Sequence, residues 1–159
     1  MSSIDSATFR RALGHFPSGV TVVTVRGADG RDYGMTVSAF SSLSLRPPLV
    51  LVCIGDDATI AGAVEAAGHF AVNVLAEDQE PLARRFADTD ADRFDGVDVS
   101  RGEGGVALLH GAAAQLQCAV VARHRGGDHT IVVGKVLAAT SADGGRALVY
   151  ERGGYRRLQ

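Results

Sequence analysis

The segment Gly34-Met-Thr-Val-Ser-Ala-Phe-Ser-Ser-Leu-Ser-Leu-Arg-Pro-Pro-Leu-Val-Leu-Val-Cys53 changes along its length from small hydroxyl residues to a continuous apolar run. Short hydroxyl side chains and backbone N–H groups leave room for a phosphate or the polar edge of a ring. The stretch over residues 34–53 is therefore a candidate ligand cradle. A serine-rich edge strand that faces water explains the same composition and stays open. The apolar run over residues 49–54 predicts an interior strand that is buried on both faces.

A second glycine-rich segment, Gly126-Gly127-Asp128-His129-Thr130, leads directly into the apolar strand expected over residues 131–136. The two glycines let the backbone approach a ligand closely. An aspartate beside a histidine can hold the imidazole and favour one tautomer. From Gly-Asp-His alone, an exposed turn histidine before a strand is the simpler interpretation.

The remaining pattern predicts a mainly β protein with a few short helices. Helices are expected over residues 5–13, 59–67 and 81–87, the last with Pro81 in its first turn. Further strands are expected over residues 20–25, in a hairpin partner ending near 36, and over 69–75, 114–123, 130–140, 147–150 and 155–158. Residues 88–105 are polar and turn-rich, and are expected to form a loop that could move or cover a site. Seven or eight strands without a βαβ rhythm favour a barrel.

Bulk properties narrow the class of protein. The 159 residues predict a single domain over residues 1–159 with an ordinary core. A net charge of −2 without a concentrated basic face argues against nucleic acid as a partner. No apolar run reaches the roughly 20 residues of a membrane span, and no signal-like N-terminus is present, so a cytoplasmic protein without membrane attachment is expected. Cys53 and Cys118 lie in apolar runs, which predicts buried free thiols.

Sequence motifs of several other chemistries are missing. The chain has no Gly-x-Gly-x-x-Gly after a strand, no Gly-x-Ser-x-Gly, no His-Glu-x-x-His and no Cys-x-x-Cys. Its five histidines are too dispersed to suggest a metal site, and none is predicted. Any dinucleotide must therefore be held by loops rather than by a dedicated helix N-terminus.

Six pieces of sequence occur in an informative order. They are Phe9-Arg10 with Phe16-Pro17-Ser18-Gly19-Val20-Thr21-Val22-Val23-Thr24, the cradle, Phe70-Ala71-Val72-Asn73-Val74-Leu75, Leu82-Ala83-Arg84-Arg85-Phe86-Ala87, Gly127-Asp128-His129, and Leu148-Val149-Tyr150 with Gly154-Tyr155. Together they resemble the short-chain flavin reductase family, the reductase components of two-component flavin-dependent monooxygenases. The resemblance covers nearly the whole chain. It implies a split β-barrel of the FMN-binding type that binds FMN or FAD, usually as a homodimer.

The resemblance also implies where the flavin binds. Five cradle residues match family positions that contact the isoalloxazine edge and the ribityl phosphate, namely Thr36, Ser38, Ala39, Ser41 and Ser42. Cys53 matches a position that lines the flavin, with a plain core cysteine as the alternative. These residues are the expected cofactor-binding set on the first half of the chain.

Three further flavin contacts are expected after the apolar strand. Thr59 would meet the phosphate together with the first amides of its helix, while Asp56 and Asp57, a departure from the family pattern, would point into water. Arg85, or its neighbour Arg84, could add positive charge, and Phe86 could form a wall beside the ring. A solvated helix face and a core anchor are the alternatives for these residues.

Gly127, Asp128 and His129 are the expected nicotinamide-binding residues, with His129 as the catalytic candidate. Hydride transfer from nicotinamide C4 to flavin N5 needs no obligatory general acid, since the cofactor carries the chemistry. His129 is therefore expected to position the nicotinamide rather than to donate a proton.

The resemblance thus implies an NAD(P)H:flavin oxidoreductase that supplies reduced FMN or FAD to a partner monooxygenase. The alternative is a flavin-binding split-barrel protein without turnover, or a relative that reduces another acceptor. The choice between FMN and FAD and the identity of the monooxygenase stay open. NADH is favoured over NADPH because no clear arginine cluster is available for a 2′-phosphate, although Arg123 and Arg125 precede the Gly-Asp-His segment.

Overall fold

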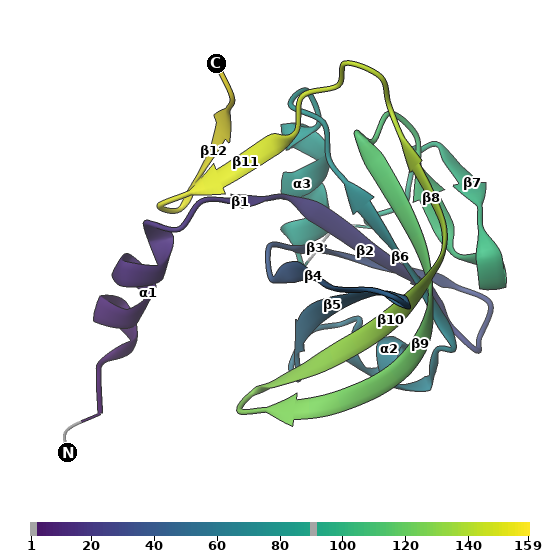
Figure 1. Ribbon diagram of the computed structural model, residues 1–159, viewed down its shortest axis with the longest axis horizontal. Coiled ribbons are helices and arrows are strands. Elements are labelled where there is room, and N and C mark those ends of the chain that lie inside the picture. The colour runs from purple at the N-terminus through teal and green to yellow at the C-terminus, as the bar shows by residue number, and fades with distance from the viewer. Residues whose placement is uncertain (1–2, 90–91) are drawn as a thin grey trace.

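A seven-stranded antiparallel sheet forms the body of the structure, a computed structural model that describes residues 3–89 and 92–159 (Figure 1). Its strands are β2 (Thr21–Arg26), β3 (Asp32–Val37), β4 (Phe40–Leu45), β5 (Pro48–Gly55), β6 (His69–Val74), β9 (Ala114–Gly126) and β10 (His129–Ser141). They follow the order β3-β2-β6-β9-β10-β5-β4. The two edge strands, β3 and β4, are consecutive in the chain, yet no ladder joins them among the described residues. The sheet is therefore a barrel that stays split, as the family resemblance implied.

Two smaller sheets accompany the barrel. One has the order β1-β11-β12, from β1 (Ser18–Gly19), β11 (Leu148–Glu151) and β12 (Gly154–Arg157). The other pairs β7 (Val99–Arg101) with β8 (Ala107–Leu109). The prediction of a plain loop over residues 88–105 is therefore wrong in its second half, because β7 and a 3-10 turn over Glu103–Gly105 lie there. The buried Thr24 hydroxyl donates to Ala107 O at 2.6 Å and fixes β8 to the barrel.

The helices are α1 (Ser6–Gly14), α2 (Ala61–Ala66) and α3 (Glu80–Ala87). The Asp5 carboxylate caps α1 by accepting from Thr8 N at 2.9 Å. The helix expected over residues 59–67 is shorter than predicted. Tight turns precede it, because Ala58 N donates to Gly55 O and Ala61 N to Ala58 O. Among the described residues, no helix has the length and apolar character needed to span a membrane.

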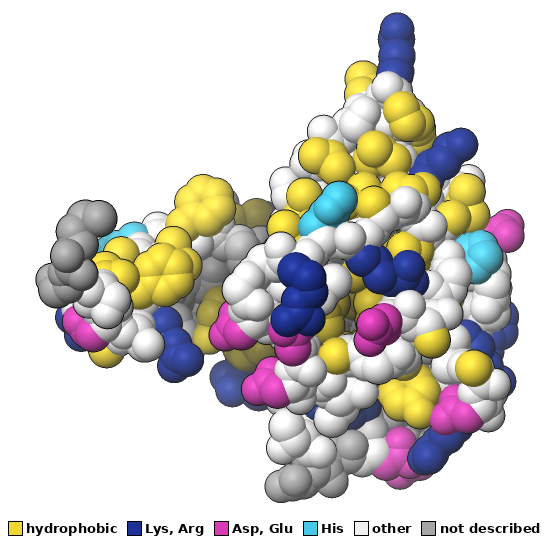
Figure 2. All heavy atoms as spheres, turned by 90° about the horizontal axis from the view of Figure 1, so that it is seen from below, with side chains coloured by type: hydrophobic (Ala, Val, Ile, Leu, Met, Phe, Trp, Pro, Cys, Tyr) yellow, Lys and Arg dark blue, Asp and Glu magenta, His cyan; other side chains and the backbone are white. Residues whose placement is uncertain are grey.

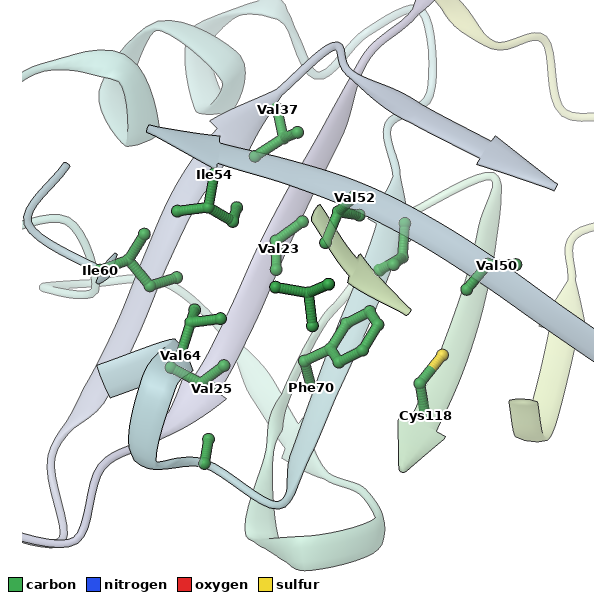
Figure 3. Packing of buried hydrophobic residues seen from close by; sticks show 13 residues of the cluster. Val23, Val25, Val37, Val50, Val52, Ile54, Ile60, Val64, Phe70 and Cys118 are labelled. Carbon is green, nitrogen blue, oxygen red and sulfur yellow. The ribbon is translucent and has the colours of Figure 1, made fainter. Parts of the chain in front are cut away.

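Strand β2 is buried on both faces because its alternate residues enter two cores. Val23 and Val25 pack into the barrel interior around Phe70 (Figure 3). Val20, just before the strand, and Val22 pack on the other side, in a cluster that includes Phe86 of α3. The residue at 134 has to be glycine at this density of packing, since a Cβ there would lie 2.5 Å from the Phe70 ring.

Helix α1 projects from the barrel on an arm beside β1, β11 and β12 (Figure 1). It contains no buried residue. Its end is tied to the β11–β12 turn, where Arg152 N donates to Gly14 O at 2.9 Å. Figure 2 shows hydrophobic side chains gathered on this arm, which stands at the left of the view. The arm thus carries apolar surface that its own chain leaves uncovered.

Candidate functional site

The ladder between β5 and β10 brings the two segments singled out in the sequence to the same end of the sheet. Cys53 lies opposite Ile131 and Gly55 opposite His129. A Cβ on Gly55 would lie 3.6 Å from His129 Nε2. The cradle joins the same end, because Cys53 N donates to Ala39 O at 2.9 Å. Residues about 75 positions apart in the sequence therefore share one surface, by the regular register of an antiparallel pair.

A cleft of about 960 Å³ opens on this surface, between the barrel and the projecting arm. Six of the predicted site residues line it: Ser38, Ala39, Ser41, Cys53, Asp128 and His129. The lining also includes Leu51 beside Cys53, which adds apolar surface next to the hydroxyl groups. Small polar groups beside an apolar floor suit a flat ring with a polar edge.

The hairpin turn after β9 presents His129 to the cleft. Gly126 pairs with His129, so Gly127 and Asp128 form a two-residue turn. Gly127 has φ +67, which suits the first turn position of a type II′ hairpin. His129 Nδ1 lies 2.7 Å from Asp128 Oδ1, and this hydrogen bond lowers the pKa of the Asp128 carboxyl. Because an ionised carboxylate only accepts, Nδ1 carries a proton in this contact.

The structure places the other predicted residues away from the lining of this cleft. Thr36 Oγ1 donates to Ala83 O at 2.6 Å, beneath α3. Ser42 is exposed on β4, and Thr59 is exposed in the turns before α2 rather than inside that helix. Gly127 shapes the hairpin turn without lining the cleft.

Phe86 and Arg85 both support the α3 region. Phe86 is fully buried and packs edge-on against Phe94, with ring centroids 5.0 Å apart. The Arg85 guanidinium donates to the carbonyl oxygens of Asp92, Arg93 and Asp95 at 2.9, 3.0 and 2.5 Å. Of the two interpretations open for Phe86, the core anchor matches its position. Arg85 orders the loop that follows α3 instead of standing free in solvent.

Sequence reasoning missed the second wall of the cleft. That wall comes from α1 and from the turn between β11 and β12, and includes Phe9, Arg10, Leu13 and Arg152. Arg152 has φ +47 and Gly153 has φ +75, the two positive values of a type I′ turn. In the sequence, the Arg-Gly-Gly run at 152–154 could have predicted this turn. Nothing in the sequence showed that this turn and α1 face the cradle.

Known proteins match both the sequence and this geometry. Residues 13–159 match the family model described as "Flavin reductase like domain". An "NADH-dependent FAD reductase" of Streptomyces globisporus is 46% identical over 97% of this chain and 86% of its own length. The reductase component of a 4-nitrophenol 4-monooxygenase/4-nitrocatechol 2-monooxygenase of Rhodococcus opacus is 44% identical over 96% of this chain and 81% of its own.

Among solved structures, the NADH:FAD oxidoreductase SgcE6 of Streptomyces globisporus C-1027, in complex with NAD and FAD fragments, superimposes with a TM-score of 0.93. It covers 100% of this chain and 98% of its own at 44% identity. Both the sequence and the fold of this chain therefore match those of flavin reductases. The chain belongs to the flavin reductase family.

Proposed function

We propose that this chain, as one domain over residues 1–159, is an NADH:flavin oxidoreductase that supplies reduced flavin to a partner monooxygenase. The observation that carries the proposal is the single cleft shared by the cradle and by the Asp128–His129 pair. Two ligands that must react face to face need such a shared surface. The named activities of the relatives from S. globisporus and R. opacus support the same proposal. A cytoplasmic location remains a prediction from the sequence.

The residues of the cleft fit a flavin. Ser38, Ala39 and Ser41 offer backbone and hydroxyl groups to the polar ring edge, and Leu51 and Cys53 form the floor under the ring. When bound, the flavin supplies the hydride-acceptor chemistry that side chains lack. His129 orients the nicotinamide carboxamide, because its ring lines the cleft while Asp128 holds Nδ1.

Residues outside the lining act on the flavin through the elements that they support. Thr36 and Phe86 fasten α3 to the barrel, and Arg85 orders the loop after it. The positive charge that phosphates require comes instead from Arg10 and Arg152 on the second wall.

NADH is the proposed reductant rather than NADPH. Arg125 pairs with Asp56 at 2.9 Å, and Arg123 donates to the carbonyl oxygens of Val64 and Ala67 at 3.2 and 2.7 Å. Both arginines near the Gly-Asp-His turn are therefore engaged, which leaves a 2′-phosphate without its usual partner. FAD is the flavin to test first, because the S. globisporus relative is named for it.

Purified protein mixed with NADH and free FAD or FMN tests the proposal. The absorbance of reduced nicotinamide should fall with multiple turnovers, and replacing NADH by NADPH should slow the reaction. Tight flavin binding without NADH oxidation would support the alternative of a binding protein. Oxidation of NADH that needs a different acceptor would support a relative with another substrate.

The protein is expected to form a homodimer through the arm. Leu13 is 57% and Phe16 81% exposed on a helical arm with no buried residue, a surface that favours burial against a second copy. Light scattering at micromolar concentration should give the dimer mass. Leu13→Asp should shift the mass toward the monomer, while Arg11→Glu, away from the cleft-lining side of α1, should not. A stable monomer mass for the unaltered protein would refute the dimer.

Ser41→Leu is expected to weaken flavin binding about ten- to hundredfold, since a bulky side chain would displace the polar edge and its hydrogen bonds. Ser42→Leu is a matched control, because Ser42 neighbours Ser41 on exposed β4 but does not line the cleft. Titration of both variants with FAD measures the difference. Equal affinities in Ser41→Leu and the unaltered protein would place the polar edge elsewhere.

A further inference from the structure

Asp56, the first residue after β5, contacts the tip of the β9–β10 hairpin at three points. Its backbone N–H donates to Asp128 O at 2.9 Å. Its carboxylate accepts from the Arg125 guanidinium at 2.9 Å and from Thr130 Oγ1 at 3.3 Å. These partners lie on both sides of His129 in the sequence. Asp56 therefore holds the backbone and side chains of residues that flank His129 in the sequence.

The ladder between β5 and β10 holds the hairpin backbone as far as His129, and the Asp56 carboxylate adds side-chain contacts beside that ladder. A cavity of about 390 Å³ lies between the hairpin and α2, lined by Ile54, Val64, Arg125 and Thr130 among others. Nearer the base of the hairpin, Arg123 donates to the carbonyl oxygens of Val64 and Ala67 and so attaches β9 to α2. Closer to the tip, Asp56, Arg125 and Thr130 line the rim of this cavity and contact one another there.

The neighbouring aspartate differs sharply. Asp57 has no hydrogen-bond or ion-pair partner among residues 3–89 and 92–159, although it is exposed in the same turn and carries the same charge. The Arg125 side chain is 74% exposed, so its ion pair with Asp56 is screened by water and adds little to stability. The effect of the Asp56 contacts must therefore be on the geometry of the tip.

We propose that Asp56 is a positioning residue that holds His129 in the orientation needed to bind the nicotinamide. The proposal rests on the NADH:flavin oxidoreductase function argued above. The sequence predicted that both aspartates point into water. For Asp56 this holds only in part, because the residue is exposed but its carboxylate also accepts from two partners on β9 and β10.

Asp56→Ala should raise the KM for NADH roughly three- to tenfold. This is the change expected when the binding free energy falls by the net contribution of one ordinary hydrogen bond. The flavin Kd and the Tm should stay at the values of the unaltered protein. Asp57→Ala, with the same loss of charge in the same turn, should leave all three quantities unchanged. Asp56→Asn should rescue part of the effect, because its amide oxygen can still accept from Thr130. Arg125→Ala combined with Asp56→Ala should have no larger effect than Asp56→Ala alone.

The NMR signals of the His129 ring provide a readout that does not depend on turnover. They should shift or broaden in Asp56→Ala, and Asp56→Asn should bring them part of the way back. An equal rise in KM for Asp56→Ala and Asp57→Ala would assign the effect to the loss of negative charge in the turn after β5 and overturn the proposal. A joint loss of Tm and flavin affinity in Asp56→Ala, or an unchanged His129 signal, would do the same. If the unaltered protein fails to oxidise NADH, the oxidoreductase function fails, while the His129 signals still decide whether Asp56 holds the ring.

Discussion

His129→Ala is expected to raise the apparent KM for NADH about five- to hundredfold while leaving flavin affinity nearly unchanged. The imidazole lines the cleft from the hairpin tip and is fixed through Nδ1 by Asp128, whereas the cradle reaches the cleft from β4 and β5. Removal of the ring therefore takes away a nicotinamide contact without disturbing the proposed flavin floor. Steady-state kinetics over a range of NADH concentrations, together with a flavin titration, measures both quantities.

His124→Ala is the matched control for this experiment. His124 is exposed on the same hairpin, but it lines the smaller cavity rather than the cleft. Its removal should leave the KM for NADH unchanged. A change in His129→Ala that is confined to kcat and brings a new, steep pH dependence would identify His129 as a proton donor. Kinetics identical to those of the unaltered protein would reduce His129 to an ordinary turn residue.

Phe86→Ala is expected to destabilise the fold by about 3–5 kcal/mol, the usual effect of deleting a buried aromatic ring. The Phe86 ring is fully buried on the inner side of α3 and contacts Phe94. A Cβ on Gly34 would lie 2.7 Å from this ring. For a domain of this size the loss corresponds to a fall in Tm of roughly 6–20 °C. Calorimetry measures it, and Phe86→Leu, which keeps most of the volume, should lose much less.

Flavin binding separates the two interpretations of Phe86. If Phe86 is a core anchor, the fraction of Phe86→Ala that stays folded at low temperature should bind FAD as the unaltered protein does. A variant with an unchanged Tm and a weakened FAD affinity would instead make Phe86 a wall of the flavin site.

Sequence patterns predicted the positions of the barrel strands well, but the prediction that residues 49–54 are buried on both faces is wrong. One face of β5 enters the barrel core, while Leu51 and Cys53 on the other face line the cleft, and an apolar run cannot distinguish a face covered by protein from one left for a ligand. Sequence patterns predicted the turn at Gly127 for a local reason, since few residues other than glycine adopt its φ of +67. The cradle was harder. Thr36 and Ser38 would share one side of a continuous strand, but β3 ends at Val37, and only Ser38 reaches the cleft.

Helix α3 shows a different limit of sequence reasoning. Its spacing of Ala83 and Phe86 indicates a buried face, but spacing cannot tell whether protein or ligand covers that face. The wall formed by α1 has no local signal at all, since a nine-residue helix without buried residues is placed by the chain that leads to and from it. Such placement depends on contacts between distant segments, which one sequence does not display.

The length of β10 determines which side of the sheet His129 faces. Between the register shift at Gly134 and the turn, the strand pairs residue by residue with both neighbours. Because side chains alternate, deleting one residue there would carry the imidazole to the opposite side, away from the cleft. Deleting two would restore the side but draw the tip back by about 6.6 Å. The nicotinamide end of the cleft should therefore tolerate changes of composition in this strand far better than insertions or deletions.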